Sequence, residues 1–198
     1  MSRTRDKPMG AADNAPILTI RARGDLRNWL GTNHGTSRSV WLASCKRHQP
    51  DYAAIIEDLL CWGWIDSVTR ALNADRSMIL IAPRKVTSGW SAIDKAHVER
   101  ARTSSAMTPA GETKIAAALA NGMWDFVTDV DGLQVPGDLT GALGQGVAAS
   151  GWDAYPKSVR RGTLEWVKTV RTAATRSARI ADVASSAAMG LRPKPYRR

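Results

Sequence analysis

The sequence contains few of the residues that bind metals or form disulfides. It has only two cysteines, Cys45 and Cys61, and three histidines among 198 residues. The cysteines do not form a C-x-x-C pair and no second pair follows, so a structural zinc site has no support. The C-x-x-H spacing of Cys45 and His48 supplies at most half of a metal site. We therefore expect two reduced thiols, no metal and no cofactor, as is usual for a cytosolic protein.

Long apolar runs are also missing. No stretch approaches the ~18 consecutive apolar residues that a membrane-spanning helix needs. The N-terminal segment, MSRTRDKPMGAADNAP, lacks the apolar centre of a secretory signal, which favours a cytoplasmic location. Residues 1–15 are polar and aperiodic, so we expect a disordered leader. Hydrophobic residues still make up 43 % of the chain, enough to form a core at this length.

The common catalytic patterns are absent as well. Ser91, Asp94 and His97 share a predicted helix surface, but that arrangement does not produce the geometry of a catalytic triad. The chain has no G-x-S-x-G element and no Walker-type phosphate loop. Residues 144–149 match G-x-G-x-x-A, yet the preceding segment has a helical pattern where a dinucleotide site needs a strand. These absences favour a protein that is not an enzyme.

Acidic residues are scarce at the C-terminal end. Residues 157–198 contain eleven Lys and Arg but only Glu165 and Asp182 as acids, a net charge of +9, whereas residues 1–156 carry +1. Such a surface attracts polyanions, either nucleic acid or an anionic membrane surface. Alternatively, these side chains only keep the protein soluble. The candidate polyanion-binding residues are Arg160, Arg161, Lys168, Arg171, Arg176 and Arg179.

Hydrophobic periodicity predicts strands first and helices later. Strands are predicted at residues 17–22 and 39–46, and a hairpin at 65–73 and 77–82. Helices are predicted at residues 26–33, 52–62, 92–102, 109–121, 139–143, 146–155, 158–170 and 180–189. This order indicates an α+β fold: a small, mostly antiparallel sheet with a hairpin, followed by a helical C-terminal part. We expect a single domain over residues 16–190, sheet-containing over 16–104 and helical over 105–190, and a flexible basic tail at 191–198.

Polar residues gather at one end of the predicted hairpin. Asp66 begins one strand and Arg84 follows the other, so antiparallel pairing brings both to the same end of the sheet. The next loop leads to Trp90 and to Ser91, which caps a helix whose free N–H groups favour an anion. This pattern predicts a site for a small anionic or carbonyl-bearing ligand. The candidate residues are Asp66, Arg84, Trp90, Ser91, Lys95 and Trp64. Alternatively, Asp66 and Arg84 form a structural ion pair and Trp90 belongs to the core.

Tryptophan is abundant and phenylalanine is rare, with eight and one in the chain. Trp62 and Trp64 flank Gly63, close to Arg70 and Arg84 in the predicted hairpin. Interleaved aromatic and basic residues can stack on nucleic-acid bases. Alternatively, these rings fill a core.

Six stretches of the chain have the order and spacing of a known family. They are SRSVWLASCK (37–46), LLCWGWIDS (59–67), APRKVTSGWSAIDKAHVER (82–100), MTPAG (107–111), NGMWD (121–125) and TRSARIADV (175–183). Together they resemble the bacterial YdeI/OmpD-associated family, also called bacteriocin-protection proteins. The resemblance implies a compact α+β domain and an association with tolerance of bacteriocins or antimicrobial peptides, with no defined substrate. Trp62 and Asp94 stand where that family usually has phenylalanine and asparagine.

These observations predict a non-enzymatic binding protein associated with stress or with bacteriocin or antimicrobial-peptide tolerance. One alternative is non-specific nucleic-acid binding through the basic C-terminal helices. A second alternative is an enzyme or small-ligand pocket around Asp66, Arg84 and Trp90.

Overall fold

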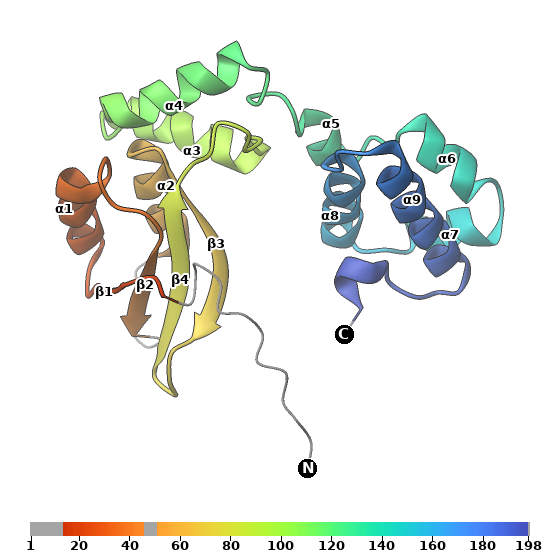
Figure 1. The fold of residues 1–198 in the computed structure, drawn as a ribbon, viewed down its shortest axis with the longest axis horizontal. Helices are drawn as coiled ribbons and strands as arrows, with labels where there is room; N and C mark the ends of the chain where they lie inside the picture. Colours follow the sequence, from red (N-terminus) through yellow and green to blue (C-terminus); the bar gives the residue numbers. More distant parts are fainter. Residues whose placement is uncertain (1–13, 46–50, 198) are drawn as a thin grey trace. The chain divides into compact units, whose positions relative to one another are not determined.

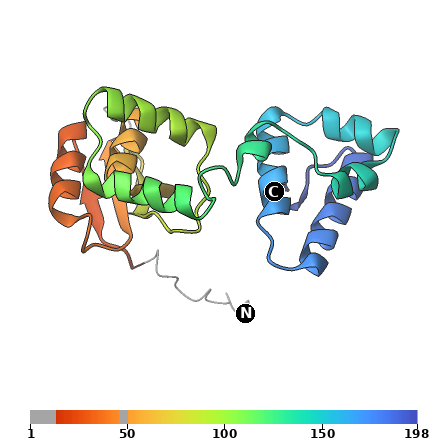
Figure 2. The same cartoon turned by 90° about the horizontal axis from the view of Figure 1, so that it is seen from above.

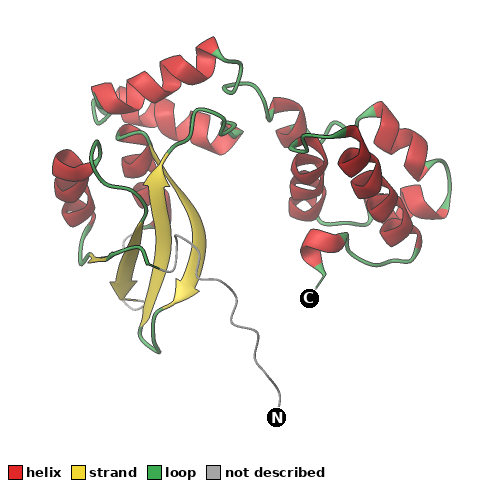
Figure 3. Ribbon diagram, viewed as in Figure 1, coloured by secondary structure: helices red, strands yellow, loops and turns green. Residues whose placement is uncertain are grey.

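The computed structural model of the protein describes residues 14–45 and 51–197. The chain divides into two compact units, residues 1–125 and residues 126–198. All strands lie in the first unit, and the second contains helices and loops (Figure 3). The predicted α+β class is therefore confirmed. Most of the predicted N-terminal leader lies outside the described residues.

The first unit is built on a four-stranded sheet. Its strands are β1 (Ile17–Thr19), β2 (Val40–Cys45), β3 (Trp64–Ala71) and β4 (Arg76–Pro83). Their order is β1-β2-β4-β3, with β4 between β2 and β3 (Figure 1). β1 runs parallel to β2, and the other two pairings are antiparallel. The predicted hairpin of β3 and β4 is thus confirmed, and the sheet is mostly antiparallel.

Two helices cover one face of this sheet, α1 (Arg23–Asn33) and α2 (Tyr52–Cys61). Alternate residues of the strands point toward these helices, because side chains on a strand alternate between its faces. The buried core here consists of Ile20, Leu26, Leu30, Val40, Leu42, Ile55, Leu59, Trp64, Ile79 and Ile81.

The first unit also includes α3 (Ala92–Thr103) and α4 (Pro109–Ala120). The predicted N-terminal signals of both helices are confirmed, because Ser91 and Thr108 are the N-caps. A second core forms here from Leu60, Trp90, Val98, Ile115 and Ala118. α2 carries apolar residues on two sides, so it packs on the sheet and also on these helices. The sheet-containing part therefore extends past residue 104 to Asp125.

The second unit has its own core. Its described residues form no strand (Figure 2). Its helices are α5 (Thr128–Asp131), α6 (Gly137–Leu143), α7 (Val147–Asp153), α8 (Lys157–Lys168), α9 (Ala173–Ala188) and the short η2 (Lys194–Tyr196). α5 lies in a segment predicted to be a loop. α9 begins at Ala173 rather than at residue 180, because the Thr172 hydroxyl accepts a hydrogen bond from the Thr175 amide and caps the helix.

The C-terminal segment, which we expected to be a flexible tail, packs against the second unit. The Tyr155 hydroxyl donates a hydrogen bond to the Leu191 carbonyl. The Lys194 amide and the Arg197 guanidinium both reach the Asp182 carboxylate, each at 2.9 Å. These contacts join Lys194 and Arg197 to α9, so both residues are part of the folded unit.

Candidate functional site

Arg84 lies at the centre of the predicted ligand site. Its side chain is only 1 % exposed, and its Nη2 donates to the Gly89 carbonyl and to Asp94 at 3.0 Å. The guanidinium lies 3.9 Å from the centre of the Trp90 ring. The structure therefore brings Arg84 and Trp90 together, as the sequence suggested. Burial lowers the pKa of Arg84, while the charges of Asp94 and Asp66 oppose that shift.

Two nitrogens of this buried guanidinium lack a protein partner. Among the described residues, Nε and Nη1 of Arg84 have no hydrogen-bond acceptor. Arginine carries five N–H donors in a fixed fork. A buried donor that loses water without gaining an acceptor costs about 1–3 kcal/mol, and more when it is charged. Water or a ligand can supply the missing acceptors.

Asp66 lies near this centre but has a different partner. It pairs across the sheet with Ile81, and its carboxylate accepts a hydrogen bond from the hydroxyl of Tyr52, the first residue of α2. Partial burial and this hydrogen bond raise the pKa of Tyr52. Arg84 forms its ion pair with Asp94. The alternative predicted a structural ion pair of Arg84, but with Asp66 as its partner.

The start of α3 was expected to offer N–H groups to an anion, but two of these groups are bonded to side chains of the helix start itself. The Ser91 hydroxyl accepts from the Asp94 amide at 3.1 Å, and the Asp94 carboxylate accepts from the Ser91 amide at 3.3 Å. This reciprocal arrangement is a capping box. Asp94 also balances the charge of Arg84. The centre therefore favours an uncharged carbonyl group over an anion.

Lys95 and Trp64 have other contacts. Lys95 pairs with Asp125 at 2.8 Å and lies over the ring of Trp124, which in turn contacts Trp90. Trp64 is buried in the sheet core and its indole N–H donates to the His34 carbonyl at 3.1 Å. Neither residue contacts the guanidinium of Arg84 through these interactions.

Two adjoining clefts lie beside the turn between α2 and β3, and no sequence pattern pointed to them. Their volumes are about 470 and 300 Å³, and both are lined by His34, Trp62 and Ala110. The rings of His34 and Trp62 are 4.8 Å apart. The W-G-W run at residues 62–64 was the available signal, but nothing local in the sequence links it to His34 at the end of α1.

The candidate polyanion-binding residues are largely paired with acids of the same unit. The ion pairs are Arg160–Asp153, Arg161–Asp131, Lys168–Asp129 and Arg176–Asp138. Arg179 lies over the Trp166 ring at 4.7 Å, and Arg171 is exposed. These aspartates precede residue 157. The charge count along the sequence therefore placed them in residues 1–156, apart from the cations that they pair with. The second unit as a whole has eleven basic and six acidic residues, a net charge of +5.

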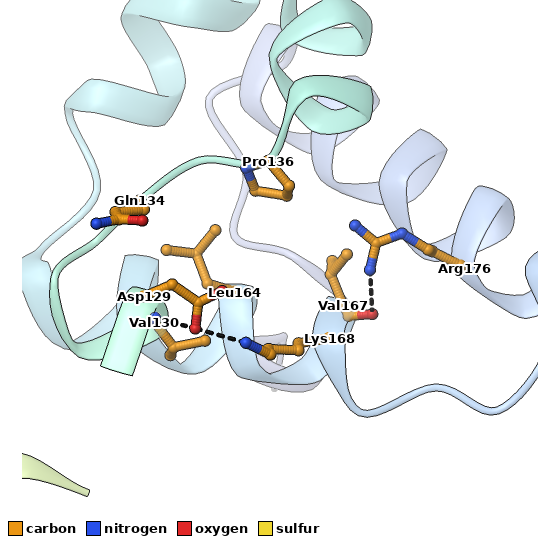
Figure 4. Close-up of a pocket in the computed structure, with 8 residues that line it drawn as sticks. All are labelled: Asp129, Val130, Gln134, Pro136, Leu164, Val167, Lys168 and Arg176. Carbon is orange, nitrogen blue, oxygen red and sulfur yellow. Dashed lines mark hydrogen bonds and ion pairs between the residues drawn. The ribbon is translucent and has the colours of Figure 1, made fainter. Parts of the chain in front are cut away.

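Two of these cations line a small pocket of about 170 Å³ in the second unit (Figure 4). Lys168 reaches Asp129 at 2.6 Å, and Arg176 donates to the Val167 carbonyl at 3.2 Å. The lining residues are Asp129, Val130, Gln134, Pro136, Leu164, Val167, Lys168 and Arg176. Both cations therefore stabilise contacts inside the unit.

Within residues 14–45 and 51–197, no group of three or more His, Cys, Asp or Glu side chains could hold a metal ion. Cys45 and Cys61 are both free thiols, and burial raises the pKa of Cys61. None of the described helices has the length and apolar character to cross a membrane.

Comparison with known families gives two matches along the chain. Residues 133–190 match the family described as bacteriocin-protection, YdeI or OmpD-associated. Residues 18–114 match a family described as a domain of unknown function, DUF8412. Of the six resembling stretches, TRSARIADV lies within residues 133–190 and NGMWD lies between the two matches. The other four lie within residues 18–114. No curated protein and no solved structure matches the chain.

Proposed function

Residues 133–190 of this chain are a YdeI/OmpD-associated domain, and on this premise we propose that the protein is a non-enzymatic binding protein that contributes to bacteriocin or antimicrobial-peptide tolerance. The ligand binds in the first unit, at the centre formed by Arg84, Trp90 and Asp94. The cytoplasmic location predicted from the sequence is part of this proposal.

The observation that carries the proposal is the buried, incompletely bonded guanidinium of Arg84. Its Nε and Nη1 point to a group with hydrogen-bond acceptors, because each N–H left without one is unfavourable. The Trp90 ring holds one face of the guanidinium at 3.9 Å and so fixes its plane. Residues 85–87 are exposed and directly follow Arg84, so a ligand would enter beside them.

The ligand is an uncharged group rich in carbonyl oxygens, such as the amide backbone of a peptide. Asp94 already neutralises Arg84, so a further negative charge would gain little there. Asp66 lies close enough to affect the pKa of Arg84 and would repel an anion. A peptide backbone offers acceptors without such repulsion. The positive charge of an antimicrobial peptide is tolerated beside Asp66.

Titration calorimetry of the full chain tests this. The probes are the blocked tripeptide N-acetyl-trialanine amide, a cationic antimicrobial peptide, and acetate as the anionic comparison. We expect both peptides to bind and acetate to bind more weakly. Arg84→Lys keeps the charge but loses the fork of donors, and should weaken peptide binding about tenfold. Arg102→Lys, at an exposed arginine paired with Glu112, is the control and should bind as wild type does.

Two results would overturn the proposal. One is the absence of any peptide binding by the wild-type chain. The other is unchanged peptide affinity in Arg84→Lys, with the variant shown by circular dichroism to be folded.

A further inference from the structure

We propose that the paired clefts beside the turn between α2 and β3 are a second binding site, for a small planar molecule that carries a carboxylate. The end of α1, this turn and the start of α4 form its walls. Trp62 and Lys114 make the decisive contacts. The site shares no residue with the Arg84 centre, so the inference is independent of the function proposed above.

Close backbone packing shapes the walls of this site. Gly63, at the turn, has a φ of +70°, and a Cβ there would lie 2.6 Å from Cγ of Lys114. A Cβ on Gly111 would lie 2.4 Å from the Cys61 carbonyl oxygen. The Thr108 hydroxyl also donates to that carbonyl at 2.6 Å. The absence of side chains at both glycines therefore lets α4 lie directly against the turn, and a hydrogen bond holds it there.

An aromatic pair with an unused hydrogen-bond donor lies where the two clefts meet. Trp62 lines both clefts, and its ring is 4.8 Å from that of His34. The indole Nε1 of Trp62 is buried, and the described part of the chain supplies no acceptor for it. Buried indole N–H groups usually have a partner. A ligand in the cleft that brought an acceptor atom to this nitrogen would satisfy it.

His34 adds an acceptor to the same site. Its Nδ1 lies 2.9 Å from the Leu30 carbonyl oxygen, so this nitrogen carries the proton and donates. In the neutral ring Nε2 is then an acceptor. The pair therefore presents one donor, Trp62 Nε1, and one acceptor beside two flat ring surfaces. Planar heteroaromatic molecules match such a surface by stacking and by edge hydrogen bonds.

The charges of the lining residues select an anion. Lys114 and Arg27 line the clefts, and the two sets of lining residues contain no Asp or Glu. Arg27 is already bonded to Asp58 at 2.6 Å, which leaves Lys114 as the main source of charge. Lys114 is partly buried, and its stem crosses Gly63. A carboxylate on a planar ligand would therefore reach the Lys114 ammonium.

The test is ligand titration of the ¹⁵N-labelled full chain by NMR, because each of the eight tryptophans gives one indole N–H signal. Trp62→Phe identifies the Trp62 signal by its loss. The probes are salicylate, nicotinate and indole-3-acetate, each with its uncharged amide. We expect at least one acid to shift the Trp62 indole signal at submillimolar to millimolar concentration, and its amide to bind at least about tenfold more weakly.

Lys114→Gln should weaken binding of that acid about tenfold, whereas Lys85→Gln, at an exposed lysine of the same unit, should not. The inference is overturned if no acid shifts the Trp62 signal, if acid and amide bind equally, or if Lys114→Gln binds as wild type does. If Lys114→Gln does not fold, the comparison of each acid with its amide on the wild-type chain tests the inference. Arg84→Lys should leave this binding unchanged, which separates the outcome from that of the peptide titration.

Discussion

At the scale of single residues, the buried carboxylate of Asp58 is held by two arginines. The residue is 0 % exposed, and it accepts from Arg23 Nε and from Arg27 Nη1, both at 2.6 Å. Neighbouring Glu57 pairs with Arg23 and Arg100. A carboxylate removed from water is tolerated only when charged donors replace its hydration. This network ties α1 to α2 over the sheet.

Asp58→Asn should therefore destabilise the protein. The amide cannot accept from two arginines as a carboxylate does, and both guanidiniums lose a charged partner. Because Arg23 and Arg27 still reach solvent, we expect a loss of about 2–3 kcal/mol, at the lower end for a broken buried ion pair. Urea unfolding measures it. Asp125→Asn, at a largely exposed partner of Lys95, should change the free energy of unfolding by less than about 1 kcal/mol.

The two thiols should differ in reactivity. Burial raises the pKa of Cys61, whereas Cys45 is half-buried at the end of β2. At a pH of about 8, iodoacetamide should modify Cys45 in the native protein and both thiols in urea, since only the thiolate reacts. The unfolded thiol ionises near pH 8.5, before the folded one. The contribution of Cys61 to stability is thus complete below that pH and is lost as the pH rises through its folded pKa. Rapid native labelling of Cys61, found by mass spectrometry, would contradict this.

At the scale of helices and strands, caps and close contacts set where elements begin and how they meet. Ser91, Thr108 and Thr172 each cap a helix with a side-chain oxygen. α4 meets the end of α2 because Gly111 has no side chain to separate it from the Cys61 carbonyl. Packing of α4 on α2 then forms the second core of the first unit and one wall of the paired clefts.

Gly111→Ala should disturb this junction. The new Cβ would lie 2.4 Å from a backbone oxygen that cannot rotate away. We expect a loss of about 2 kcal/mol or more in the free energy of unfolding, as in overpacked cores. The control is Gly24→Ala in α1, where nothing lies within 4 Å of the added Cβ, and alanine should be neutral or stabilising by up to about 1 kcal/mol. Equal effects of the two substitutions in thermal unfolding would refute the close contact.

At the scale of the whole molecule, each unit has its own hydrophobic core. Residues 126–198 bury a set that includes Leu139, Trp152, Leu164 and Val183. We therefore expect residues 126–198, produced alone, to retain helical circular dichroism and a cooperative thermal transition. A random-coil spectrum would instead favour the single domain predicted for residues 16–190.

Polyanion binding by the second unit stays a prediction, and the ion pairs make it weaker than the sequence suggested. We expect duplex DNA or anionic vesicles to bind with a Kd of about 10⁻⁴–10⁻⁶ M or weaker, and binding to fade as salt rises. Arg171→Glu, at an exposed position, should weaken it without changing stability. Arg161→Glu should lower the melting temperature, because Arg161 pairs with Asp131 and Glu165. A fluorescence titration in which wild type binds neither polyanion at low salt would contradict this.

Much of the fold followed from the sequence because its signals are local. The hairpin of β3 and β4 follows from alternating strands around a short turn. Thr108-Pro109 and Ser91 mark helix starts through hydrogen bonds that span three residues. The early start of α9 was missed because Ala173–Arg179 carries no apolar stripe, and α5 was missed because it is a single turn.

Only the tertiary structure decided which side chains meet. Asp58 and Arg23 are separated by 35 residues, and Trp64 and His34 by 30. Arg161 and Asp131, which form an ion pair, are also separated by 30 residues. No periodicity encodes such contacts, because they depend on how whole helices pack. The sequence by itself determined most of the elements, the caps at Ser91 and Thr108, and the net charge. Packing determined that four of the six candidate polyanion-binding cations pair with acids, that Asp94 rather than Asp66 pairs with Arg84, and that Trp62 lines a cleft with a donor that has no acceptor among the described residues.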